Sequence, residues 1–406
     1  MAKLKEFKGI RPRKDIASSV AELPYDVVNT AEAKAIAGKN KYNFYHVTRP
    51  EIDLPEEINL YDNAVYAKGK ENLESLIKEG ALIQDHAENL YLYTLIMNGR
   101  AQTGLVSCFH IDDYLNNIIK KHELVLDSKA EDRRKHIDIL NAQTGLVFLF
   151  YKEDGGKKAL FDKAMQIKPE YDFLSADGIR HIFRVISDKE IIGGFKKAFA
   201  DEVLYIADGH HRAYSAVKVG LERKEKNPKH TGTENYNWFV ATLFPHNELL
   251  IMPYNRAVTD LNGLSIDEYF KKLEEKYTIE KINIIAEKHC FRMYLQNKWY
   301  KLVPKFGLPD DAVKSLDSQI LHDTILDPVL NIKNPRNDKR IEFIGGVRGE
   351  KELERLVDSG KFAVAFSLEP VLIDELIRVS DEDKLMPPKS TWFEPKLRDG
   401  LVIHRL

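Results

Sequence analysis

One stretch, VLYIADGHHRAYSAVKVG at residues 203–220, constrains the fold of this chain more than any other. The apolar run over residues 203–207 predicts a buried β-strand. The small apolar side chains that recur over residues 212–219 predict a helix. Residues 208–211 between them therefore form a strand-to-helix turn.

This turn has the chemistry of an anion site. The first amide groups of a helix have no partners inside the helix and carry the positive end of its dipole. Gly209 permits close approach of the backbone, and Arg212, which we expect on the surface, can clamp phosphate oxygens in a bidentate way. The imidazoles of His210 and His211 can donate hydrogen bonds or move protons near neutral pH. We expect phosphate to bind here.

Asp208 is the one group of the turn that would repel a bare phosphate. Its presence makes sense if it holds a metal ion, a substrate amine or an attacking hydroxyl. A purely structural Asp-Gly turn is the alternative interpretation. Zinc is disfavoured because the side chains of adjacent His210 and His211 point apart on most backbones and no HExxH spacing occurs.

The overall charge and the cysteines narrow the function classes. The chain has 61 basic and 63 acidic residues, a net charge of -2, which disfavours nucleic acid as a partner. Cys108 and Cys290 alone cannot form a disulfide framework. The basic N-terminus has no apolar segment behind it, and no run approaches the ~20 apolar residues of a membrane span. We expect a cytoplasmic protein without membrane partners.

Further local signals predict how the chain is organised. Asn98-Gly99 between two apolar runs predicts a β-hairpin, and Ser187 or Asp188 is expected to cap a helix. We divide the chain into a region 1–264, which carries the phosphate turn, and an α/β segment 265–406 whose tail loop packs back.

Five motifs resemble known proteins. IADGHHR is similar to the phosphate-binding signature of the ParB/sulfiredoxin superfamily, in the form typical of archaeal-type free serine kinases. The whole chain resembles a large bacterial and archaeal family that carries this signature. The matching segments, in order, are LPYDVVN (23–29), YNFYHVTRPEIDLP (42–55), KHELVLDSKAEDRRKHI (121–137), IADGHHRAYSA (206–216) and MPPKSTWFEPKLRDGLVI (386–403).

The resemblance implies a fold and an activity. The implied fold is α+β, a small ParB/sulfiredoxin-like mixed sheet with helices, elaborated by N- and C-terminal segments. The sulfiredoxin cysteine is a histidine here, and we find no basic recognition helix of the ParB type. The implied activity is Mg²⁺-dependent phosphoryl transfer from ATP or ADP to a small hydroxyl acceptor, with free L-serine the leading candidate. A nucleotide-binding or hydrolysing regulatory module without a small acceptor is the alternative.

The resemblance also suggests roles for individual residues. The serine kinases use a glutamate ahead of the phosphate turn as general base, which makes Glu123 the candidate and Asp208 the alternative. Asp208 is also the expected Mg²⁺ ligand. Within the same motif, Asp132, Arg133 and His136 would form either a phosphate pocket or a solvated helix face. His122, a further candidate for a ligand contact, lies beside Glu123.

Two more segments hold candidates for ligand contacts. Asp26 follows Pro24-Tyr25, and it could contact the substrate amine or ribose or start a helix as an Asx turn. The proline-dense segment 386–403 carries Lys389 and Lys396, and a lysine held there could meet a nucleotide phosphate.

Overall fold

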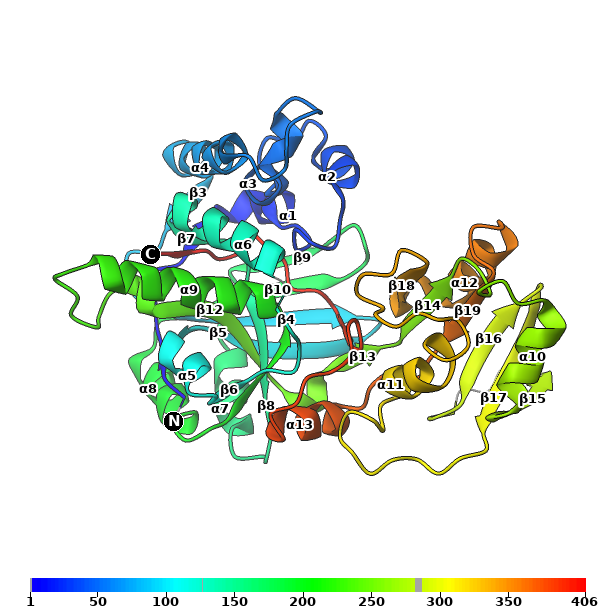
Figure 1. Ribbon diagram of the computed structural model, residues 1–406. Helices are drawn as coiled ribbons and strands as arrows, with labels where there is room; N and C mark the ends of the chain where they lie inside the picture. Colours follow the sequence, from blue (N-terminus) through cyan, green and yellow to red (C-terminus); the bar gives the residue numbers. More distant parts are fainter. Residues whose placement is uncertain (1, 126, 282–286) are drawn as a thin grey trace. The chain divides into compact units, whose positions relative to one another are not determined.

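The computed structural model describes residues 2–125, 127–281 and 287–406, which form two compact units (Figure 1). Unit 1 comprises Met1–Lys121, Val125–Leu249 and Pro395–Leu406. Unit 2 comprises His122–Leu124 and Leu250–Glu394. The sequence places a boundary after residue 264, whereas the chain enters unit 2 at Leu250. Its last residues, Pro395–Leu406, belong to unit 1.

Unit 1 is built on a nine-stranded mixed sheet, larger than the small sheet expected from the sequence. The pairs β11–β6 and β12–β8 are parallel, and the other pairs are antiparallel. In sheet order the strands are β6 (Ile119–Lys120), β11 (Leu204–Asp208), β8 (Val147–Tyr151), β12 (Trp238–Pro245), β5 (Arg100–His110), β4 (Leu90–Met97), β10 (Arg180–Ile186) and β9 (Tyr171–Leu174), with β1 (Leu4–Lys5) paired to β5.

The hairpin expected at Asn98-Gly99 is confirmed. Met97 at the end of β4 pairs with Arg100 at the start of β5, which leaves a two-residue loop. Asn98 and Gly99 have φ angles of 51° and 80°. Positive φ at both loop residues matches the right-handed twist of the two strands, which is why Asn-Gly is favoured here.

One face of this sheet carries the main core of unit 1. Successive side chains of a strand point to opposite faces, so Leu204 and Ile206 of β11 lie on the same face, and both are fully buried. Ala213, Ala216 and Val217 of α9 pack into the same core, as their helical spacing predicts. The helices that contribute to unit 1 after the first hairpin are α5 (Ile111–Leu115), α6 (Asp127–Leu140), α7 (Lys158–Met165), α8 (Lys189–Ala198) and α9 (His210–Lys226).

Two of these helices are important for the site. α6 and α9 pack against each other, and Figure 1 shows them side by side.

Asp188 caps α8, as the sequence predicts. Its carboxylate accepts hydrogen bonds from the amides of Glu190 and Ile191 at 2.8 and 3.1 Å, so the expected capping residue is confirmed.

A second, smaller core lies among the N-terminal helices of unit 1. It includes Phe44, Val47 and Leu73, together with Leu140 of α6 and Ile403 of the C-terminal tail. The tail is held by β21 (His404–Arg405), which pairs with β7 (Ala142–Gln143). The N-terminal elements are β2 (Ile10–Pro12), η1 (Lys14–Ile16), α1 (Ala17–Val20), α2 (Thr30–Ala37), α3 (Tyr45–Thr48), η2 (Pro50–Asp53), α4 (Asn63–Lys78) and β3 (Leu82–Gln84).

Unit 2 contains a six-stranded sheet in which all pairs are antiparallel. The strand order is β15 (Tyr277–Lys281), β17 (Lys298–Pro304), β16 (Phe291–Leu295), β19 (Val364–Ser367), β14 (Tyr254–Val258) and β18 (Ile341–Gly345). β13 (Leu250–Met252) pairs separately with β20 (Trp392–Glu394). The helices of unit 2 are α10 (Ile266–Glu274), α11 (Asp317–Leu321), α12 (Gly349–Asp358) and α13 (Ile373–Asp381).

The two cysteines are free thiols, and both are buried. Burial raises the pKa of the Cys108 thiol well above its ordinary value. Within residues 2–125, 127–281 and 287–406, every helix is too short or too polar to cross a bilayer.

Candidate functional site

The strand-to-helix turn has the form that the sequence predicts. β11 ends at Asp208, Gly209 is the N-cap with φ 89° and ψ 31°, and α9 begins at His210. A Cβ atom on Gly209 would lie 2.8 Å from Nε of Arg212, so a side chain here would displace Arg212 as well as strain the left-handed backbone. Because glycine also offers no capping oxygen, no N-cap side chain bonds to the first amides of α9.

Asp208 is held in place by its neighbours. Its Oδ1 accepts from the amide of Gly209 at 2.9 Å. Its Oδ2 lies 3.4 Å from Nζ of Lys396 and 3.6 Å from Nη2 of Arg212. Burial alone would raise the pKa of Asp208, but the two cations outweigh it and hold that pKa well below its usual range. The carboxylate is therefore ionised at neutral pH and is a weak proton acceptor.

Arg212 is a buried residue, and the expectation that it lies on the surface is wrong. Only 8% of Arg212 is exposed, and its Nη1 donates to the carbonyl of Leu146. The reason is that α9 packs directly on the sheet, so the first turn of the helix has little solvent around it. The carboxylates of Asp208, Asp26 and Asp399 surround the guanidinium and raise its pKa against the effect of burial.

α6 supplies a second buried arginine. Arg133 pairs with Asp132 at 2.7 Å and stacks on the ring of Tyr25, with 3.8 Å between the guanidinium carbon and the ring centroid. Asp132 in turn accepts from the hydroxyl of Tyr66 at 2.9 Å. These contacts fix the direction of Arg133, because its partner carboxylate is itself held by Tyr66 of α4.

His136 and His210, which are influenced by these arginines, are neutral at pH 7. His136 Nε2 donates to the carbonyl of Val47 at 3.0 Å, and burial together with Arg133 lowers the pKa of His136 to about 3. Burial likewise lowers the pKa of His210 to about 3, although Asp208 opposes the shift. Neither imidazole can act as a cation toward a phosphate at neutral pH. Neutral donors and acceptors are the roles left to them.

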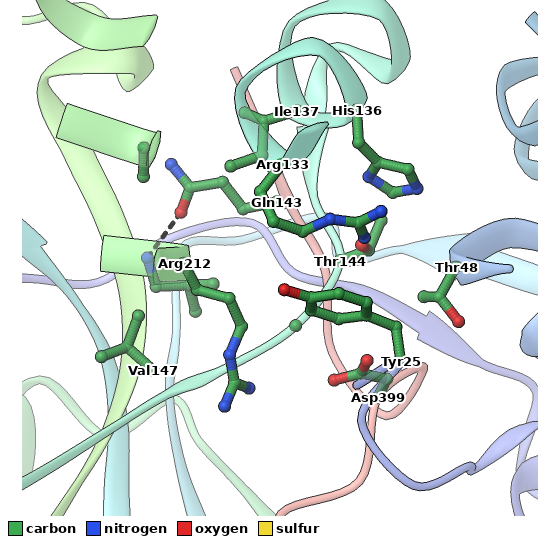
Figure 2. A pocket seen from close by; sticks show the side chains of 13 residues that line it. Tyr25, Thr48, Arg133, His136, Ile137, Gln143, Thr144, Val147, Arg212 and Asp399 are labelled. Carbon is green, nitrogen blue, oxygen red and sulfur yellow. Dashed lines mark hydrogen bonds between the residues drawn. The ribbon is translucent and has the colours of Figure 1, made fainter. Parts of the chain in front are cut away.

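Two pockets adjoin these residues and share four lining side chains. The first, of about 20 Å³, has Arg212 and Asp399 in its wall (Figure 2). The second, of about 240 Å³, has Asp26, Asp132 and the Arg49–Glu51 ion pair in its wall. The side chains that line both pockets are Tyr25, Thr48, Arg133 and His136.

The sequence-based candidates divide between the two units. Most of them lie in unit 1 around these pockets and the turn: Asp26, Asp132, Arg133, His136, Asp208, Gly209, His210, His211 and Arg212. Three lie in unit 2: His122, Glu123 and Lys389. Of the two lysines considered in the segment 386–403, Lys396 contacts Asp208, and Lys389 lies over the ring of Tyr254 within unit 2.

Asp399 and residues 143–145, at the end of β7, line the smaller pocket and are not among the sequence-based candidates. Asp399 is 2% exposed and lines the smaller pocket, and its Oδ1 has no hydrogen-bond partner. Gln143 holds the neighbouring strand β12 by accepting from the amide of Val240 at 2.7 Å. The available signal was the Asp-Gly pair Asp399-Gly400 in the lysine-bearing segment 386–403.

The described residues form no cluster of three or more metal-ligating side chains. Asp208, the expected Mg²⁺ ligand, is a single carboxylate that already faces two cations. Mg²⁺ is usually bound through one or two carboxylates together with substrate phosphates. A single carboxylate therefore does not fit a resident ion, and Mg²⁺ that accompanies the nucleotide stays a prediction.

Comparisons with known proteins give one match over much of the chain and several remote ones. A family model described as "Protein of unknown function (DUF1015)" matches residues 4–319. A search of curated proteins found no match.

Among solved structures, a mutant free serine kinase in complex with AMP has 12% identity and a TM-score of 0.36, covering 71% of this chain and 86% of that chain. A conserved hypothetical protein from Pyrococcus furiosus has 12% identity and a TM-score of 0.35, covering 72% and 93%. C-terminally truncated SbnI from Staphylococcus aureus has 10% identity and a TM-score of 0.39, covering 72% and 85%.

Proposed function

The chain belongs to the DUF1015 family, and we propose that it is a nucleotide-dependent phosphotransferase, with ATP or ADP as donor and free L-serine as the leading acceptor. The observation that carries the proposal is the start of α9, where a glycine N-cap, Arg212 and Lys396 come together at the end of a buried strand. An anion at this point would meet the amides of the helix and two cationic side chains.

Asp208 positions both cations at the turn. Both lie 3.4 Å or more from Asp208, which is longer than a good charge-assisted hydrogen bond. Arg212 has five N–H donors, and its Nη1 is directed to the carbonyl of Leu146. The remaining donors of Arg212 and the ammonium of Lys396 are the groups we assign to the donor phosphates.

Phosphoryl transfer suits such a site because it needs positioning and charge neutralisation more than covalent chemistry. Arg212 and Lys396 would neutralise phosphate charge on one side of the turn. Arg133, aligned by Asp132 and Tyr25, offers a further cation at the wall that both pockets share. We place the acceptor hydroxyl in the smaller pocket, whose wall includes Arg212.

The proton acceptor is a separate assignment. Glu123, our sequence-based candidate, lies in unit 2, and the phosphate turn lies in unit 1. Asp208, the alternative, is a poor base because Lys396 and Arg212 keep its pKa low.

The test is a product assay. Purified protein is incubated with ATP or ADP and L-serine, and the products are separated as phosphoserine and inorganic phosphate. Formation of phosphoserine is the expected result. Release of inorganic phosphate alone would favour the second possibility, a nucleotide-hydrolysing regulatory module, and the absence of both products with either nucleotide would contradict the proposal.

A further inference from the structure

Asp399 stands out as a buried acid whose position is fixed by its backbone. Its amide donates to the carbonyl of Glu22 at 2.8 Å, and its carbonyl accepts from the amide of Glu22 at 3.2 Å. The next residue, Gly400, has φ 86°, and a Cβ there would lie 2.8 Å from Phe44. The chain is thus pinned on both sides of Asp399, and the direction of its side chain is set by the fold.

The carboxyl group of Asp399 lines the smaller pocket with one oxygen unused. Oδ1 has no hydrogen-bond partner although the residue is only 2% exposed. Leaving a buried acceptor unpaired costs free energy, so such groups call for an explanation. The explanation we examine is that a ligand supplies the missing partner.

The unused oxygen faces the same space as Arg212. A Cβ on Gly145 would lie 2.9 Å from Oδ1 of Asp399 and 3.3 Å from Cδ of Arg212, so the glycine keeps the space between the two side chains open. Figure 2 shows the carboxylate of Asp399 and the guanidinium of Arg212 reaching toward this space from two sides. A group placed there would touch a phosphate-binding cation and a carboxyl oxygen together.

The groups around Asp399 bring the pKa of its carboxyl group close to neutral pH. Burial raises the pKa of Asp399, and Arg212 lowers it. Asp26 raises the pKa further, so the net pKa is about 7. A general base works best when its pKa is close to the operating pH. The groups that face it from the packed elements are Arg212 of α9, Arg133 of α6, and Asp26 and the backbone amide of Tyr25 from the segment before α2.

We infer that Asp399 is the general base that takes the proton from the acceptor hydroxyl. This inference rests on the proposed function. In the step, the hydroxyl oxygen bonds to the terminal phosphorus of the donor, and the bond from that phosphorus to the bridging oxygen breaks. The hydroxyl proton moves to Oδ1 of Asp399, and the nucleotide leaves with one phosphate fewer. The assignment replaces Glu123 as the base.

The experiment compares Asp399→Asn with Glu22→Gln. Glu22 is a matched control, because burial also raises its pKa to about 7. Unlike Asp399, Glu22 lines neither pocket, and its carboxylate accepts a hydrogen bond from the side-chain amide of Asn43. We expect Asp399→Asn to lower kcat by the ~10²- to 10⁴-fold of a lost general base while the Kd for ATP stays within about threefold. We also expect wild type and Glu22→Gln to share a fall in kcat/KM below pH 7 that Asp399→Asn lacks.

A second readout does not depend on activity. Infrared difference spectra of wild type and Asp399→Asn isolate the carboxyl band of residue 399, which should titrate near pH 7. A midpoint near the ordinary value of an aspartate, about 3.9, would overturn the inference even if Asp399→Asn turns over too slowly for kinetics.

The remaining outcomes separate the two proposals. Wild-type protein that forms no phosphorylated acceptor contradicts the proposed function and the base role with it. Active wild type together with an equally active Asp399→Asn overturns the base role alone. Loss of ATP affinity with unchanged kcat would make Asp399 a donor-binding residue and would also overturn it.

Discussion

Nζ of Lys396 lies 3.4 Å from Oδ2 of Asp208, although 188 positions separate the two residues in the chain. The same carboxylate lies 3.6 Å from Arg212, so Asp208 aligns two cations at the start of α9. The strand-to-helix turn is therefore completed by a residue from the C-terminal tail of unit 1.

Lys396→Ala removes one of these cations. If Lys396 binds donor phosphate, the Kd for ATP should rise by about tenfold or more, since a charge-assisted hydrogen bond contributes about 1.5–3 kcal/mol. Isothermal titration calorimetry measures this directly. The control is Lys158→Ala, which breaks the exposed ion pair of Lys158 with Asp162 on α7 and should leave ATP binding unchanged. Equal ATP affinities of the two variants would show that Lys396 does not bind the donor phosphates.

Arg212→Lys tests whether the guanidinium itself is required. The substitution keeps the charge but loses the fork of donors, so ATP binding should weaken by about tenfold or more. Because Arg212 is buried and donates to Leu146, we also expect Tm to fall, in contrast to the intact fold that a surface arginine would leave. Calorimetric unfolding gives the Tm, and an unchanged Tm would contradict the role of the Leu146 contact.

Gly209→Ala tests the turn through its backbone. The φ of 89° is costly for alanine, and the new Cβ would lie 2.8 Å from Nε of Arg212. We expect a loss of about 1–3 kcal/mol in the free energy of unfolding and weaker ATP binding, because Arg212 must move. Gly155→Ala, at φ 89° with nothing within 4 Å of its Cβ, is the matched control for strain without displacement. Similar ATP affinity in both variants would show that the contact with Arg212 is unimportant.

Asp399 should make the stability of unit 1 depend on pH. An aspartate titrates near 3.9 in an unfolded chain, whereas burial raises the pKa of Asp399 to about 7. Between these values the folded protein binds a proton that the unfolded chain has lost, so stability decreases as pH rises across this window. Asp399→Asn should therefore have a higher Tm than wild type at pH 8 and a smaller advantage at pH 5. Parallel Tm curves for the two proteins would contradict the raised pKa.

The sequence by itself determined the features that depend on neighbouring residues. Asn98-Gly99 gave the hairpin because only residues tolerant of positive φ fit a two-residue turn. Asp188 capped α8 because its side chain reaches amides two and three positions ahead. The turn from β11 through Gly209 into α9 was predictable for the same reason, since an apolar run, a glycine and a helical spacing are all local patterns.

Tertiary structure alone decided what surrounds that turn. Nothing local in the sequence indicates that Arg212 is buried, because its exposure depends on how α9 packs against the sheet. Lys396 and Asp399 reach the site only because the C-terminal tail pairs with residues near the start of the chain and with β7. Such contacts are selected by the packing of the whole unit and by the closure of long loops, and neither is encoded in the residues next to Lys396 and Asp399.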